Sequence, residues 1–213
     1  MKKDFNLTDF AIRYGFLLLM LGLVIGFSVA QPAFLSARSG VFILQSVAIT
    51  GILALGVTAT LVVGGFDLSI GAVATSALML SAYAMVIWEL GAVEAVLLCL
   101  AMVALVGLIN GLLIVKMKVP DLLATLGMMF LLMGLQRIPT EGNSISTGMS
   151  LPGGGTATGT FSEGFLMLGR YRLDFILEDL VPLSVVFLIV IALLVWGFLE
   201  LTRHGRVMYA IGS

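Results

Sequence analysis

The feature that most constrains this chain is a series of apolar runs, each about long enough to cross a lipid bilayer. A bilayer core of about 30 Å requires about 20 apolar helical residues, because backbone amides in lipid must bond within their own segment. Such runs occupy approximately Tyr14–Ala30, Val41–Val63, Gly71–Trp88, Ala92–Val115, Val119–Gln136 and Leu180–Leu199. The sequence therefore predicts an all-α integral membrane protein, a polytopic helical bundle with about six transmembrane helices.

Composition supports this class and excludes several others. Hydrophobic residues make up 60% of the chain and charged residues 11%, whereas a soluble domain has about 25% charged residues. The net charge of -1 provides no basic stripe for nucleic acid, so the lipid bilayer is the expected surrounding. Cys99 and His204 are the only cysteine and histidine, and we expect neither an internal disulfide nor a metal or other cofactor.

Basic residues predict the orientation, since cytoplasmic loops hold an excess of Lys and Arg. Placing both chain ends in the cytoplasm puts seven basic residues inside, namely Lys2, Lys3, Arg13, Lys116, Lys118, Arg203 and Arg206. Four then lie outside: Arg38, Arg137, Arg170 and Arg172. Both termini are therefore expected to be cytoplasmic, and residues 137–179 form a periplasmic loop.

Two segments have alternative interpretations. The first apolar run resembles a signal peptide, but acidic residues before it and the small-residue spacing of Gly22 and Gly26 favour an uncleaved anchor. The glycine-rich segment Pro152–Gly159 lacks a Gly-Lys-Ser/Thr sequence and follows no strand, which excludes a nucleotide-binding P-loop. It is expected to be a flexible outer loop.

An acidic residue lies between the second and third predicted spans, in the sequence GGFDLSIG at Gly64–Gly71. Ionisable residues at membrane depth are costly, so Asp67 is a functional candidate. One interpretation is a capping turn, in which Gly64 and Gly65 relax the backbone and Asp67 or Ser69 accepts bonds from free helix amides. The other is a discontinuous helix lining a path for a polar solute, and the two are compatible.

Other polar residues also lie within the predicted spans. Asp121 follows Pro120 at the start of the fifth span, where a helix start is favoured over a ligand role. Asn110 and Thr125 are uncharged groups that fit interhelical packing or contact with a solute. A catalytic pair would need His204, which is far along the chain from membrane-depth serines, so no catalytic residues are expected.

Three motifs together resemble the membrane permease subunits of ribose/xylose-type sugar ABC importers. They are GGFDLSIG at Gly64–Gly71, VPDLLATLG at Val119–Gly127 and TRHGRVMYAIG at Thr202–Gly212, in this order and spacing. Phe66 stands where Ile or Thr is commoner, and Ser213 replaces a more usual glycine. The resemblance spans nearly the whole chain.

This resemblance implies a permease in the bacterial inner membrane that moves a ribose-, xylose- or galactose-like monosaccharide into the cytoplasm. Its partners would be a cytoplasmic ATP-binding subunit, a periplasmic sugar-binding protein and a second permease subunit, most simply an identical one. ATP would be hydrolysed on the separate subunit, and Arg203, Gly205 and Arg206 would lie near the coupling surface. Gly64, Gly65, Asp67, Ser69, Asn110 and Thr125 are the candidates for the translocation path.

The family pattern continues beyond Ser213 with a coupling helix and further spans, so residues 1–213 look like a single, incomplete permease domain. We expect a chain of this length to insert into the membrane without moving sugar. The alternatives are a secondary transporter or channel for a small polar solute, or an inactive permease fragment. A secondary transporter or channel would need a second acid at membrane depth, or a buried Lys or Arg, to bind a coupling ion, and the sequence lacks such a residue.

Overall fold

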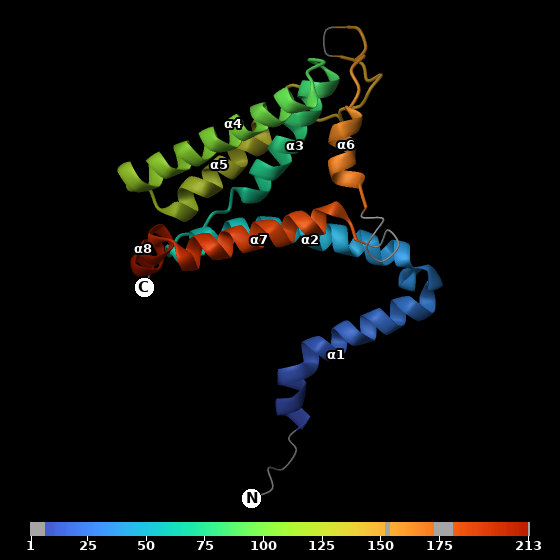
Figure 1. The fold of residues 1–213 in the computed structure, drawn as a ribbon, viewed down its shortest axis with the longest axis vertical. Helices are drawn as coiled ribbons and strands as arrows, with labels where there is room; N and C mark the ends of the chain where they lie inside the picture. The colour runs from blue at the N-terminus through green and yellow to red at the C-terminus, as the bar shows by residue number, and fades with distance from the viewer. Residues whose placement is uncertain (1–6, 152–153, 173–180, 213) are drawn as a thin grey trace, which may run out of the picture. The chain divides into compact units, whose positions relative to one another are not determined.

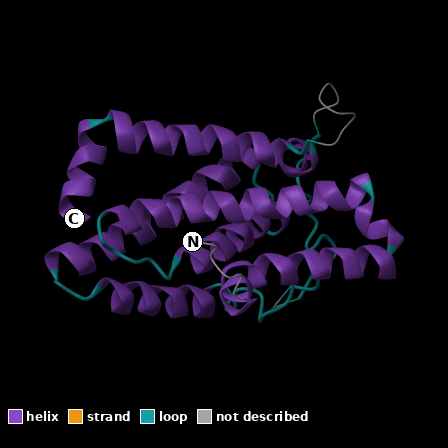
Figure 2. Ribbon diagram, turned by 90° about the horizontal axis from the view of Figure 1, so that it is seen from below, coloured by secondary structure: helices purple, strands orange, loops and turns teal. Residues whose placement is uncertain are grey.

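The computed structural model describes residues 7–151, 154–172 and 181–212, and in these ranges helices are joined by turns and loops (Figures 1 and 2). Extended structure in the described ranges is limited to two isolated bridges, Ser150 with Thr156 and Arg172 with Pro182. The chain divides into two compact units. One comprises Met1–Ser46 and Arg172–Pro182, and the other comprises Val47–Tyr171 and Leu183–Ser213.

The first unit contains α1 (Leu7–Ala30), a short 3-10 helix (Pro32–Leu35) and the beginning of α2 (Ala37–Val62). The rings of Phe27 and Phe34 lie 5.9 Å apart and hold the corner between α1 and the 3-10 helix. A Cβ atom added at Gly22 or Gly26 would have nothing within 4 Å. The small-residue face that the sequence predicts is therefore open among the described residues of this unit.

The second unit contains the rest of α2 together with α3 (Ile70–Val86), α4 (Ala92–Gly111) and α5 (Asp121–Leu135). A π-helical turn, Leu112–Lys116, extends α4. The helices α3, α4 and α5 pack on one another around the buried side chains of Ala72, Val106, Met128 and Leu132. This apolar contact is the core of the three-helix group.

Two further helices, α7 (Leu183–Leu201) and α8 (Arg203–Gly212), complete the second unit. The helix α7 runs beside α2 (Figure 1), and a Cβ atom at Gly51 would lie only 2.9 Å from Leu188 Cδ1. A Cβ atom at Gly56 would lie 2.8 Å from Ile70 Cδ1. Glycines on α2 thus allow neighbouring side chains to approach its backbone.

All six predicted spans form helices, which confirms the polytopic helical membrane class. Four are long and apolar enough to cross a membrane: Arg13–Ala30, Ala37–Val62, Ala92–Lys116 and Leu183–Leu201. The 17 residues of α3 and 15 residues of α5 are shorter, equal to about 25 Å and 22 Å at the rise of an α-helix. The sequence-based boundaries made both too long, because Trp88 and Gln136 fall beyond their ends.

The long loop contains more local structure than the flexible loop that the sequence predicts. It includes α6 (Glu163–Arg170), whose N-cap Ser162 accepts a hydrogen bond from Phe165 N at 3.3 Å. Gly159 N donates to Val86 O at 3.2 Å, which ties the loop to the end of α3. The predicted loop residues 152–153 and 173–179, like Lys2, Lys3 and Leu180, lie outside the described residues.

Candidate functional site

The polar candidates meet where α2 ends and α3 begins. Gly64 has a φ of +77°, a left-handed conformation that glycine adopts without the strain a side chain would bring. The amide of Gly65 donates to Thr60 O at 3.0 Å and closes the last turn of α2. The segment Phe66–Ser69 then connects the two helices outside regular helical structure, so its amides need other acceptors.

Asp67 supplies one of these acceptors from within the segment. Its Oδ1 atom accepts hydrogen bonds from Ser69 N at 2.7 Å and from Ser69 Oγ at 2.6 Å. Ser69 is the N-cap residue of α3, although its own side chain makes no capping bond. Asp67 thus holds the N-cap residue itself rather than a free amide of the first turn of α3, and it fixes the backbone immediately before that helix.

The first turn of α5 supplies two more acceptors. Asp121 Oδ2 accepts a hydrogen bond from Phe66 N at 2.6 Å, and Thr125 Oγ1 accepts one from Leu68 N at 3.2 Å. The hydroxyl of Thr125 in turn donates to Asp121 O at 2.8 Å. The motif at Gly64–Gly71 is thus joined by hydrogen bonds to the motif at Val119–Gly127, more than 50 residues further along the chain.

A side chain of α4 completes the group. Asn110 Nδ2 donates to Ser69 Oγ at 3.2 Å, and Ser69, Thr125 and Asn110 are 0%, 2% and 7% exposed. Asn110 Oδ1 is also buried and has no hydrogen-bond partner in the described part of the chain. The helices α3, α4 and α5 are therefore joined by a polar contact inside an otherwise apolar group.

The structure brings together all the path candidates that the sequence predicts. Asp67, Ser69 and Asn110 are linked through hydrogen bonds, Thr125 bonds to the amide of Leu68 between Asp67 and Ser69, and the two glycines form the adjoining turn. Sequence reasoning missed only the role of Asp121, which it placed simply at a helix start. The carboxylate of Asp121 after Pro120 marks a helix start in the sequence, but no local pattern identifies the amide of Phe66 as its hydrogen-bond partner. We call residues 64–69, together with Asn110, Asp121 and Thr125, the helix junction.

The predicted coupling residues lie on α8, which follows α7 after a sharp corner at Thr202. Thr202 Oγ1 donates to Phe198 O at 2.6 Å and accepts from Gly205 N at 3.1 Å. A Cβ atom at Gly205 would lie 2.0 Å from Leu199 O, so only glycine fits this corner. Arg203 and Arg206 are exposed on the same helix.

A second contact joins α8 to α7. Tyr209 OH donates to Glu200 Oε1 at 3.2 Å. Desolvation, together with the hydrogen bond to Glu200 and its negative charge, raises the pKa of Tyr209 above its ordinary value. The phenol therefore remains protonated, and able to donate this bond, throughout the neutral pH range.

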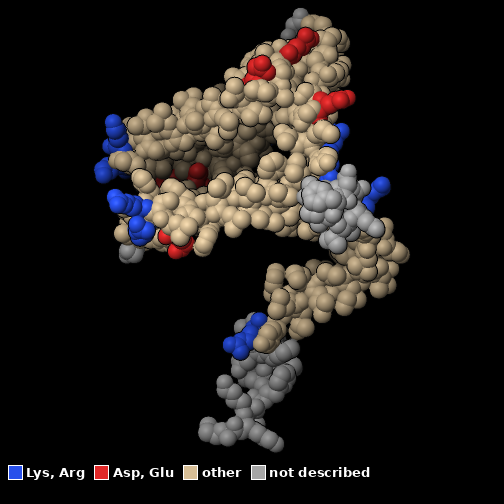
Figure 3. Space-filling view, viewed as in Figure 1, with Lys and Arg blue, Asp and Glu red and all other residues tan. Residues whose placement is uncertain are grey.

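Charge is unevenly distributed over the second unit (Figure 3). Lys and Arg side chains gather where α8 and the connection from α4 to α5 lie, and these segments contain Lys116, Lys118, Arg203 and Arg206. Acidic side chains appear toward the opposite end, where α3 leads into α4, and also beside the basic residues of α8. The two pairs of basic residues that the sequence assigns to one side therefore share one end of this unit.

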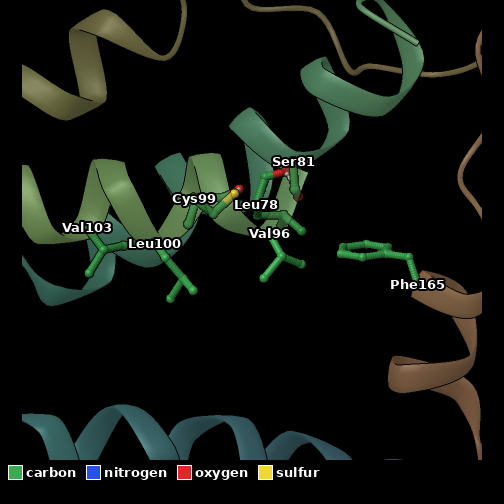
Figure 4. A pocket seen from close by; sticks show the side chains of 8 residues that line it. Leu78, Ser81, Val96, Cys99, Leu100, Val103 and Phe165 are labelled. Carbon is green, nitrogen blue, oxygen red and sulfur yellow. Dashed lines mark hydrogen bonds between the residues drawn. The ribbon is translucent and has the colours of Figure 1, made fainter. Parts of the chain in front are cut away.

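A pocket of about 400 Å³ lies away from the helix junction, on α3 and α4 near Phe165 of α6 (Figure 4). Its lining is mostly aliphatic, and Leu78, Val96, Leu100 and Val103 contribute to it. Its polar groups already bond to backbone, because Ser81 Oγ donates to Leu78 O at 2.8 Å and Cys99 Sγ to Ala77 O at 3.2 Å. Such a pocket suits an apolar group and offers a sugar few partners.

Long apolar helices, a polar helix junction and a basic end define a polytopic helical membrane protein. The chain belongs to the family described as branched-chain amino acid transport system / permease component, whose sequence profile matches residues 40–213. In the described residues no group of three or more His, Cys, Asp or Glu side chains could hold a metal ion.

Several curated proteins are similar to this chain. The ribose import permease protein RbsC of Bacillus subtilis is 35% identical over 192 residues, which cover 90% of this chain and 54% of the relative. The galactose/methyl galactoside import permease protein MglC of Haemophilus influenzae is 30% identical over 222 residues, covering 99% and 62%. RbsC of Escherichia coli K12 is 31% identical over 197 residues, covering 92% and 57%.

The chain thus spans 54% to 62% of the length of these relatives. They are import permeases rather than enzymes, and they confirm the resemblance to sugar permeases that the three motifs indicate. No solved structure matches the chain.

Proposed function

We propose that this chain forms the membrane permease of an ATP-binding cassette importer that moves a monosaccharide, ribose- or galactose-like, into the cytoplasm. The observation that carries the proposal is its similarity, over 90% of the chain, to a ribose import permease. The helix junction adds a physical reason. It places two carboxylates, two hydroxyls and an amide at a break between apolar helices, where polar groups are costly unless they serve packing or transport.

The proposed orientation has both termini in the cytoplasm of the bacterial inner membrane. The basic end of the second unit supports it, because α8 and the α4–α5 connection place their Lys and Arg residues together (Figure 3). A reporter fused after Ser213 should then report the cytoplasm, and one inserted at Gly154 the periplasm. The reverse pattern would contradict this orientation.

The proposed partners follow from the source of energy. The sequence contains no Gly-Lys-Ser/Thr nucleotide-binding loop, so ATP would be hydrolysed by a separate cytoplasmic subunit. That subunit would dock near Arg203, Gly205 and Arg206 on α8. A periplasmic sugar-binding protein would deliver the solute at the side of the long loop, and a second permease subunit, identical in the simplest case, would complete the pathway.

The helix junction is proposed as the part of the pathway that changes between states. Its backbone amides at Phe66, Leu68 and Ser69 are held by side chains rather than by a regular helix. Hydrogen bonds of this kind can exchange partners with a smaller rearrangement than the unwinding of a helix needs. Asp67→Asn retains an acceptor for Ser69 N but removes the charge, and we expect it to lower uptake while membrane abundance stays near normal.

The decisive experiment measures uptake of labelled ribose and galactose into proteoliposomes that contain the permease extended beyond Ser213 as the family pattern predicts, its ATPase and the binding protein. We expect uptake that requires ATP and all three components. Asp67→Ala, measured in parallel, should lower both abundance and uptake, because it also removes the acceptor for Ser69 N. ATP-independent uptake by the permease alone would overturn the proposal in favour of a secondary transporter.

A further inference from the structure

The far end of α8 lies against the turn that begins the helix junction. A Cβ atom at Gly212 would lie 2.1 Å from Val62 O and 3.1 Å from Gly64 N. A Cβ atom at Gly64 would in turn lie 3.7 Å from Gly212 Cα. The last residue of α8 and the end of α2 therefore meet backbone to backbone, with no room for a side chain between them.

The near end of α8 is held equally closely. Gly205 packs against the backbone of Leu199 at the α7–α8 corner, and Tyr209 bonds to Glu200 on α7. The helix has 10 residues, a length of about 15 Å at the rise of an α-helix. Over these residues the helix is fixed near Gly205 to α7 and at Gly212 to the turn at Gly64.

On its other side, the same turn is held by α5. Asp121 accepts the hydrogen bond from Phe66 N, and a Cβ atom at Gly65 would lie 3.6 Å from Asp121 Oδ2. Within the same segment, Leu68 N donates to Thr125 Oγ1 on α5, and Ser69 Oγ accepts a hydrogen bond from Asn110 on α4. Residues 64–69 therefore lie between the end of α8 and the first turn of α5.

We propose that the Gly64 turn transmits movement of α8 to the group of α3, α4 and α5, with Gly212 and Asp121 as positioning residues on its two sides. The inference rests on the proposed function, in which α8 faces the ATPase. Backbones that touch without side chains between them cannot move far independently, so a displacement of α8 toward the turn must displace the turn as well. The hydrogen bonds to Asp121 and Thr125 then pass that displacement to α5.

The contact itself is tested by hydrogen exchange of the purified permease. Gly212→Ala forces α8 away from Val62, and amides of residues 66–69 should then exchange about tenfold faster. Gly197→Ala is the matched control, since a Cβ atom there has nothing within 4 Å. The control should leave exchange of residues 66–69 unchanged. Unchanged exchange in Gly212→Ala, or equal acceleration throughout the α3–α5 core, would overturn the proposal.

The coupling is tested by measuring sugar uptake and ATP hydrolysis on the same reconstituted importer. Gly212→Ala should still co-purify with the ATPase and hydrolyse ATP, but with about tenfold less sugar moved per ATP, whereas Gly197→Ala should match the unaltered protein. A normal ratio of sugar moved to ATP hydrolysed in Gly212→Ala would overturn the proposal that the Gly64 turn transmits movement of α8. Absence of uptake by the unaltered importer would instead refute the proposed function, and hydrogen exchange would still decide whether the contact exists.

A second pair of variants tests the turn from α5. Asp121→Ala removes the acceptor for Phe66 N and should reproduce both the faster exchange and the lower ratio of sugar to ATP. Asp121→Asn keeps an oxygen acceptor and should restore most of the ratio. Equal behaviour of Asp121→Ala and Asp121→Asn would contradict a positioning role for Asp121. This pair still tests the proposal if Gly212→Ala fails to reach the membrane.

Discussion

The two ends of the second unit are held together by different means. At the helix junction, glycines bring backbones into contact and side chains such as Asp121 and Thr125 satisfy the free amides. At the other end, α3, α4 and α6 meet through aliphatic side chains and Phe165, and a pocket of about 400 Å³ remains (Figure 4). The helix junction depends on specific partners. The pocket lining depends on approximate filling of space, and the specific backbone contact of Gly159 with Met85 and Val86 lies outside that lining.

This difference predicts how each end responds to substitution. Each hydrogen bond and backbone contact of the helix junction needs a specific partner, so a substitution that removes one partner leaves a buried group unsatisfied or a helix displaced. Apolar side chains around an open pocket can repack at little cost. Small changes should therefore be severe at the helix junction and mild near the pocket, and the following variants test this contrast.

The largest effect is expected at the corner between α7 and α8. Gly205→Ala would place Cβ 2.0 Å from Leu199 O, and backbone atoms cannot yield without shifting a helix, so we expect a loss of about 3 kcal/mol. Thermal unfolding in detergent and membrane abundance measure this loss. Gly197→Ala on α7 is the control and should be neutral or slightly stabilising. Equal stability of the two variants would remove the close-contact explanation.

An intermediate effect is expected from removing a single hydroxyl at the helix junction. Thr125→Val keeps the shape but leaves Leu68 N without its acceptor, at a cost of about 1–3 kcal/mol. Ser81→Ala removes a buried hydroxyl beside the pocket, whose partner Leu78 O belongs to the same helix. That change should cost about 0.5 kcal/mol or less. The contrast between the ends fails if denaturation midpoints of the two variants shift equally.

The smallest effect is expected at Cys99, which contributes to the pocket lining. Cys99→Ala removes a weak sulfhydryl bond to Ala77 O and little packed volume, so stability should change by about 0.5 kcal/mol or less. Thermal unfolding of this variant provides the measurement. A loss as large as that of Thr125→Val would show that the pocket end is as tightly specified as the helix junction.

The sequence by itself determined the helices and the position of the break between α2 and α3. Apolar runs and glycines are local signals, because each helix in lipid satisfies its own backbone and glycine ends it locally. The same reasoning selected Asp67, Ser69, Asn110 and Thr125, since polar groups stand out within apolar runs. It missed α6, whose eight residues are fewer than the window of about 11–18 residues over which helical periodicity is read from sequence.

Only the tertiary structure decided which of these residues meet. Asp121 bonds to an amide 55 residues away, and Gly212 lies against Val62 across the whole of α3 to α7. Neither pairing can be recognised in the sequence. A carboxylate at a helix start and a glycine in the last turn of a helix each have a common local role, so neither residue indicates a distant partner. Their partners are fixed by how the helices pack, which depends on side chains distributed over the entire unit.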